Sequence, residues 1–126
     1  IITEVREGGL SFVEAEKKVL GIDHAELGGR IAEKWRFSDA MVEIIRNHHN
    51  PDRASSEELS ISIVYMGDCV SMMLGIALGS DGLAYRYYSQ VADRLHFSEA
   101  DLQKTMIRFR GKLATVEALV SLSKEE

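Results

Sequence analysis

The sequence has few of the residues that interrupt or cross-link a helical chain. Proline occurs once, at Pro51, and cysteine once, at Cys69. A single cysteine excludes an internal disulfide and the paired-cysteine motifs of structural zinc sites. It is also typical of a protein of the reducing cytoplasm, which is where we expect this one to be. The 126 residues suit one domain with one core, and we treat 1–126 as that domain.

The sequence also lacks an unbroken run of lysine and arginine and an uninterrupted membrane-spanning segment. The net charge is −5, which argues against nucleic acid as a partner. The most apolar window, 59–78, has Asp68 at its centre. A central carboxylate costs roughly 2.5–3.5 kcal/mol on membrane insertion, so a buried helix is expected and a membrane is not. The chain begins Ile-Ile without a basic segment, so we expect no signal peptide, and it could be a piece of something longer.

Most segments read as helices with recognisable ends. Ser11 with Glu14, Asp23 with Glu26 and Ser55 with Glu58 each have the spacing of a capping box. With the turn cluster at 79–82 and the scarcity of period-two alternation, they predict an all-α bundle of five to six helices. The expected helices cover 12–20, 23–35, 38–49, 56–78, 82–94 and 99–123.

The last predicted helix carries a heptad-like apolar seam. Its members are spaced by four and three residues in turn, as in a coiled coil: Leu102, Met106, Phe109, Leu113, Val116 and Val120. Such a seam either packs on the core of its own domain or pairs with a partner helix. The sequence leaves both readings open.

Polar side chains interrupt the apolar faces of three predicted helices. His24 joins Gly28, Ile31 and Trp35 on one face, while His48 and His49 end the Met41–Val42–Ile45 stripe. Asp68 lies between Val64 and Met72 on the stripe that begins at Ile61. Imidazole and carboxylate are ligands of divalent metals, so one reading is a metal site formed by His24, His48, His49 and Asp68. In the other reading the histidine pair caps a helix C-terminus and Asp68 accepts a hydrogen bond from it.

Two stretches of the sequence resemble the HDOD domain, the HD-related output domain of bacterial signalling proteins. They are GIDHAELGGRIAEKWRFSDAMVEIIRNHHNPD and, after it, IVYMGDCVSMMLGIALG. The residues that carry the resemblance keep the family's order and spacing: Gly21, His24, Gly28, Lys34, Trp35, His48, His49, Pro51 and Asp68. The resemblance covers roughly 10–115, and it implies the C-terminal part of a longer HD-type helical domain.

The resemblance also implies a function. HDOD domains are similar to HD-superfamily phosphohydrolases, in which residues like His24, the His48–His49 pair and Asp68 belong to a metal-binding set. This chain has no His-Asp doublet and no Gly-Tyr-Pro motif after His49. The resemblance therefore predicts a non-catalytic regulatory module in signal transduction, with no cofactor required. The alternative is a metal-dependent phosphodiesterase in which a divalent ion is held by those four residues.

The expected partner is another signalling protein or domain, with a homodimer as a further expectation. Two apolar faces are candidates for a contact: the face of Phe12, Ala15 and Val19, and the seam at 102–120.

Overall fold

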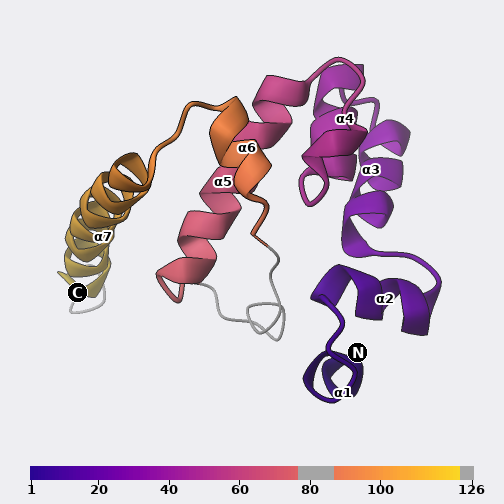
Figure 1. Cartoon of the computed structure of the whole chain (residues 1–126), viewed down its shortest axis with the longest axis horizontal. Coiled ribbons are helices and arrows are strands. Elements are labelled where there is room, and N and C mark those ends of the chain that lie inside the picture. The colour runs from indigo at the N-terminus through magenta and orange to yellow at the C-terminus, as the bar shows by residue number, and fades with distance from the viewer. Residues whose placement is uncertain (77–86, 123–126) are drawn as a thin grey trace.

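The computed structural model describes residues 1–76 and 87–122, with side chains described as far as residue 116. The all-α prediction is confirmed, because every regular element within these ranges is a helix (Figure 1). Seven α-helices and one 3₁₀ turn follow one another along the described chain: α1 (Ile2–Arg6), α2 (Phe12–Leu20), α3 (His24–Lys34), α4 (Asp39–Asn47), η1 (Pro51–Arg53), α5 (Glu58–Met73), α6 (Ser89–Arg94) and α7 (Glu99–Leu122). No helix in the described part of the chain is long and apolar enough to cross a bilayer.

Several predicted helix ends are confirmed. Ser11 and Glu14 form a reciprocal capping box at the start of α2, and Gly21 ends that helix in the left-handed conformation, with φ of 76°. Ser38 accepts a hydrogen bond from the backbone of Met41 and so caps α4. These caps satisfy backbone groups that helix ends would otherwise leave without partners.

The predicted capping box at the start of α5 is wrong. Both hydroxyls, of Ser55 and Ser56, donate to the carboxylate of Glu43 on α4, and α5 begins only at Glu58. The carboxylate of Glu43 competes successfully for these donors because it accepts from both hydroxyls and both backbone N–H groups. The turn therefore ties α4 to the approach to α5.

The remaining predicted boundaries are met in part. Asp23 caps α3, but the carboxylate of Glu26 pairs with Arg30 and Arg46 and does not return to the cap. Helix α4 ends at Asn47, so His48 is its C-cap and His49 lies beyond the helix. The predicted turn at 79–82, the start of the helix predicted at 82–94, and Val120 of the seam lie outside the described residues or side chains.

The core lies between α5 and α6, and α3 packs along α4. Of the α5 stripe predicted from Ile61, Val64, Asp68 and Met72, only Ile61 is fully buried, and Val64 is exposed. The buried side chains of α5 are Ile61, Ser62, Tyr65, Met66, Cys69 and Val70. This helix is apolar on most of its circumference, so sequence periodicity could not select the inward face.

The inward face of α3 also differs from the prediction. Its buried residues are the small ones, Ala25, Gly29 and Ala32, while Ile31 and Trp35 are exposed. Small side chains let the two helix backbones approach closely, and this preference outweighs the burial of larger apolar groups on α3.

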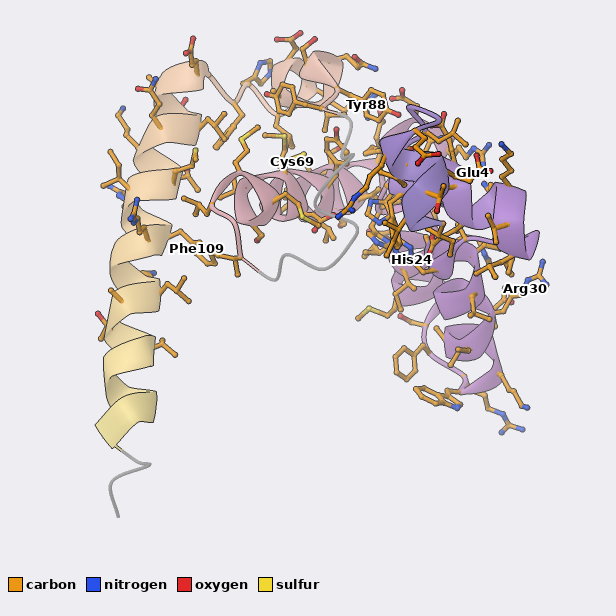
Figure 2. The ribbon with its side chains drawn as sticks, turned by 90° about the horizontal axis from the view of Figure 1, so that it is seen from below. Glu4, His24, Arg30, Cys69, Tyr88 and Phe109 are labelled. Carbon is orange, nitrogen blue, oxygen red and sulfur yellow. The ribbon has the colours of Figure 1, made fainter. Side chains whose placement is uncertain are left out.

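Helix α7 lies apart from α1–α4 and contacts the rest of the chain through α5 (Figures 1 and 2). Its first turn is closed by Ser98, which accepts from the backbone of Asp101 and donates to its carboxylate. The seam is not part of the core, because Leu102, Met106 and Leu113 are half-buried and Phe109 and Val116 are exposed.

Candidate metal centre

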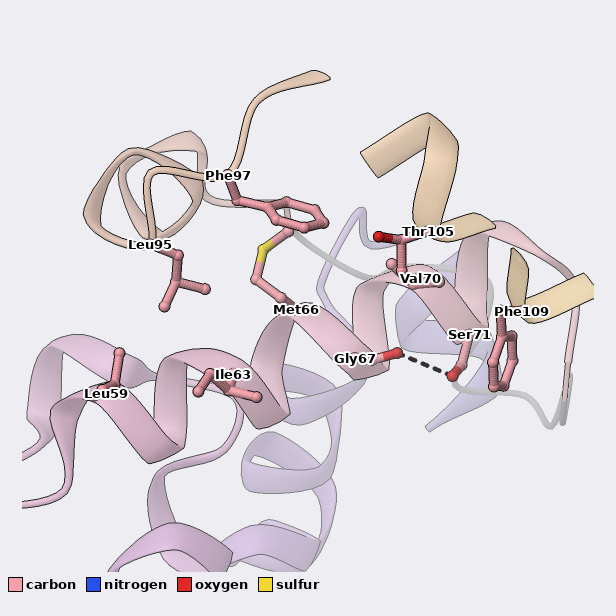
Figure 3. Close-up of a pocket in the computed structure, with 10 residues that line it drawn as sticks. All are labelled: Leu59, Ile63, Met66, Gly67, Val70, Ser71, Leu95, Phe97, Thr105 and Phe109. Atoms are coloured by element: carbon pink, nitrogen blue, oxygen red, sulfur yellow. Dashed lines mark hydrogen bonds between the residues drawn. The ribbon is translucent and has the colours of Figure 1, made fainter. Parts of the chain in front are cut away.

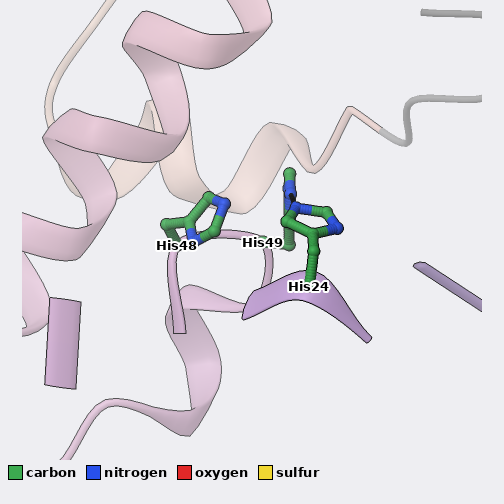
Figure 4. Close-up of side chains that lie close together, drawn as sticks. All are labelled: His24, His48 and His49. Carbon is green, nitrogen blue, oxygen red and sulfur yellow. Dashed lines mark hydrogen bonds between the residues drawn. The ribbon is translucent and has the colours of Figure 1, made fainter. Parts of the chain in front are cut away.

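Three histidines converge where α3 begins and α4 ends (Figure 4). His24 is the first residue of α3, His48 is the C-cap of α4, and His49 follows it. The Nε2 atoms of His24 and His49 are 2.7 Å apart, and the rings of His48 and His49 have centroids 4.0 Å apart. Because α3 and α4 pack side by side, the start of one helix meets the end of the other, and the three rings form one cluster.

Glu16 of α2 holds His24 in position. Its Oε2 atom lies 2.6 Å from Nδ1 of His24 and 3.1 Å from the backbone nitrogen of the same residue. Glu16 is buried, and a carboxylate can only accept, so the proton of the neutral His24 ring lies on Nδ1. The Nε2 atom of His24 therefore presents its lone pair to the cluster.

His48 is fixed in the same way by the backbone. Its Nδ1 atom lies 2.6 Å from the carbonyl oxygen of Ile45, which also can only accept. This bond satisfies a carbonyl of the last helical turn of α4, so His48 caps that helix end, whereas His49 lies beyond the helix. The bond also leaves the Nε2 lone pair of His48 available.

The ring of His49 is largely buried and is neutral at physiological pH. Burial, followed by the nearby positive charge of His48 and His24, lowers its pKa to about 3. The Oδ2 atom of Asp68 lies 3.6 Å from Nδ1 of His49. This distance is too long for a hydrogen bond, so the pair is a neighbour contact and not the bonded pair that the sequence predicts.

The three rings are a candidate site for a single divalent metal ion. One ring nitrogen from each of His24, His48 and His49 lies within 4.8 Å of the other two. Two of these rings donate Nδ1–H to an oxygen, which is the usual arrangement for histidines that bind a metal through Nε2. Without an ion, a proton must lie between the two Nε2 atoms that are 2.7 Å apart. Borderline ions such as Zn²⁺ or Co²⁺ suit a set of three imidazoles.

The structure brings together three of the four predicted site residues. Asp68 is the exception, because its carboxylate faces the Nδ1 side of His49 and its side chain remains 28% exposed. Sequence reasoning missed Glu16. The signal was an acidic residue on an apolar helix face. Glu16 lies four residues after Phe12 on the apolar face of α2, just as Asp68 lies on an apolar helix.

Comparison with known proteins finds a family match for the part of the chain that holds the histidine cluster. The family model of the HDOD domain matches residues 1–51, which include His24, His48 and His49 but not Asp68. No curated protein and no solved structure matches the chain.

Proposed function

Because the HDOD-domain model matches residues 1–51, we propose that the chain is a non-catalytic regulatory module of signal transduction that acts through protein–protein contacts. A regulatory or output role is consistent with the family. The contact and the absence of catalysis are our proposal.

The observation that carries the proposal is an exposed apolar surface on α3, which we call the Trp35 patch. It comprises Leu27, Ile31, Trp35 and Phe37. The first three are spaced by four residues and lie along one side of the helix, and the rings of Trp35 and Phe37 have centroids 6.2 Å apart. Trp35 is 68% exposed. Tryptophan is enriched at the energetic centres of protein interfaces, and contiguous exposed apolar groups mark such sites.

The position of the patch links it to the histidine cluster. His24 lies one turn before Leu27 on α3, so a change at the cluster is transmitted along one rigid helix to the patch. The partner we propose is another signalling domain that covers Trp35.

Site-specific photo-cross-linking tests the contact. A benzophenone amino acid replaces Trp35 in the protein as its host makes it, and the adducts are identified by mass spectrometry. The control places the same amino acid at Glu7, which is exposed at the end of α1. We expect one dominant protein adduct from position 35 and none from position 7. Equal labelling from the two positions would contradict the proposal.

The second candidate function is a metal-dependent phosphohydrolase. The observation in its favour is the proton placement on His24 and His48, which leaves two Nε2 lone pairs for a metal ion. A bound divalent ion would supply a water of lowered pKa as the nucleophile. It remains second because the chain has no His-Asp doublet and the Asp68 carboxylate lies outside the group of three nitrogens.

A further inference from the structure

An open apolar groove lies between α5 and α7 (Figure 3). Its volume is about 530 Å³. Helix α5 lines it with Leu59, Ile63, Met66 and Val70, and α7 lines it with Thr105 and Phe109. Leu59 is 63% exposed and Ile63 is 56% exposed, so these side chains are in water unless another molecule covers them.

The groove has the length and spacing of a helix-binding site. The α5 residues that line it recur at intervals of four, three and four, which places them in one row along the helix. From Leu59 to Val70 this row is about 16 Å long at 1.5 Å per residue. It therefore matches about three turns of a docked amphipathic helix, whose apolar anchors follow the same spacing.

The two sides of the groove differ in the charges that flank them. Asp68 is the one charged residue between 59 and 73, and it lies beside His49. On α7 the lining residues Thr105 and Phe109 are flanked by basic ones, because Lys104, Arg108 and Lys112 follow one another at four-residue spacing along the helix. Residues 102–116 contain four basic side chains and no acidic one, in a chain of net charge −5. Among the described side chains, neither Arg108 nor Lys112 has an ion-pair partner.

From this combination we infer that the groove binds an acidic amphipathic helix of another protein. Its apolar anchors would cover the α5 row and Phe109, and its carboxylates would pair with Arg108 and Lys112. The inference rests on the proposed function and names the class of partner. The α7 helix of a second copy is a poorer occupant, because it would bring two sets of four cations against each other.

The test is a selection from a yeast-displayed library of amphipathic helices. The apolar anchors are fixed at positions one, five, eight and twelve, and all other positions are randomised. The bait is the whole chain at low salt. We expect the selected helices to be net acidic and their binding to weaken at least tenfold between 50 and 300 mM salt. No enrichment, or enrichment of neutral or basic helices, would overturn the inference.

Matched variants place the selected helix in the groove. Phe109→Ala is expected to weaken binding at least tenfold. Ile107→Ala should change it less than twofold, because Ile107 is on the same helix, 74% exposed and outside the groove. The double variant Arg108→Glu/Lys112→Glu should reverse the preference and select basic helices. If Phe109→Ala lowers helicity in circular dichroism, Leu59→Ser replaces it as the groove variant. Binding unaffected by the groove variants would overturn the inference.

Light scattering tests whether a second copy of the chain, and not a foreign helix, occupies the groove. A dimer that is lost in Phe109→Ala and kept in Ile107→Ala would show that a second copy fills the groove, and would overturn the inference of a foreign partner. The proposed function fails separately, since it depends on cross-links from position 35 and not on the groove.

Discussion

The carboxylate of Glu16 on α2 contacts Nδ1 of His24 on α3 at 2.6 Å, and the same oxygen accepts the backbone N–H of His24. One buried acid therefore joins two helices and fixes the proton of a histidine whose other nitrogen faces His49. No sequence motif relates these residues, which are eight positions apart and on different helices. The contact makes Glu16 part of the candidate site.

Replacement of Glu16 by alanine is expected to destabilise the fold by about 1–3 kcal/mol, because it leaves two donors of His24 without their acceptor in a partly buried place. Glu16→Gln is the control, since its amide oxygen can still accept one of these bonds, and it should cost less than the alanine variant. Urea denaturation at pH 7 measures both. Equal stability of the alanine variant and the parent chain would contradict the role assigned to Glu16.

The close approach of α3 and α4 predicts that Gly29→Ala destabilises the chain by about 1–3 kcal/mol through overpacking. A Cβ at Gly29 would lie 2.9 Å from Nε and 3.0 Å from Cβ of Arg46, and the latter atom is fixed to the backbone of α4. Gly67→Ala on α5 is the matched control, because nothing lies within 4 Å of the added carbon. There the helix propensity of alanine should stabilise by about 0.5–1 kcal/mol. Thermal melts would refute this account if both variants changed stability in the same direction.

Local signals in the sequence were sufficient for most of the helices and for several of their ends, but they did not reveal α1. Ser11, Gly21 and Ser38 act through neighbours three or four residues away, so their roles can be read from spacing alone. The three histidines were also predicted as a set, together with Asp68, because all four interrupt the apolar faces of predicted helices.

Interactions between helices could not be predicted from the sequence. Ser55 and Ser56 have the sequence of a cap, yet Glu43, twelve residues earlier, takes their hydrogen bonds. Trp35 likewise points outward because the glycine and alanine face of α3 packs against α4, where only small side chains fit. Such choices depend on three-dimensional packing, for which a periodic pattern carries no information.

The bonds to Glu43 predict a contribution to stability that depends on pH. Hydrogen bonds from the hydroxyl of Ser56 and from the backbone of Ser55 and Ser56 lower the pKa of Glu43 from 4.5 to about 2. Because the pKa is lower in the folded state, the stabilisation is present above pH 4.5 and is lost as the pH falls towards 2. We expect the chain to be more stable than its Glu43→Gln variant at pH 7, with the gap narrowing below pH 4.5 and closing as the pH approaches 2. The substitution leaves every other titratable group in the sequence unchanged, so the difference between the two proteins isolates Glu43. A gap that stays constant with pH would contradict the bonds.

The histidine cluster predicts that each chain binds one Co²⁺ ion. The visible absorption of the bound Co²⁺ measures this binding. His24→Ala should abolish binding, and Glu16→Gln should weaken it by 10–100-fold, because it alters the partner that orients the ring. Asp68→Ala should change the affinity less than threefold, since its carboxylate lies 3.6 Å from the outer nitrogen of His49 and makes no hydrogen bond with it. A large loss on Asp68→Ala would instead place this carboxylate on the metal.

We expect the chain alone to show no phosphodiesterase turnover, even if the cluster holds a metal ion. Three imidazoles could bind one ion, but the described residues show no second group of ligands and the sequence contains no His-Asp doublet. A single ion without a ligating carboxylate lacks the second metal that stabilises the leaving oxygen in two-metal centres. The assay incubates the chain with a cyclic dinucleotide and a panel of nucleotide phosphoesters, with Mn²⁺ or Fe²⁺ present. His24→Ala serves as the control for contaminating activity. Turnover that exceeds the blank and disappears in both His24→Ala and Asp68→Ala would establish the phosphohydrolase instead.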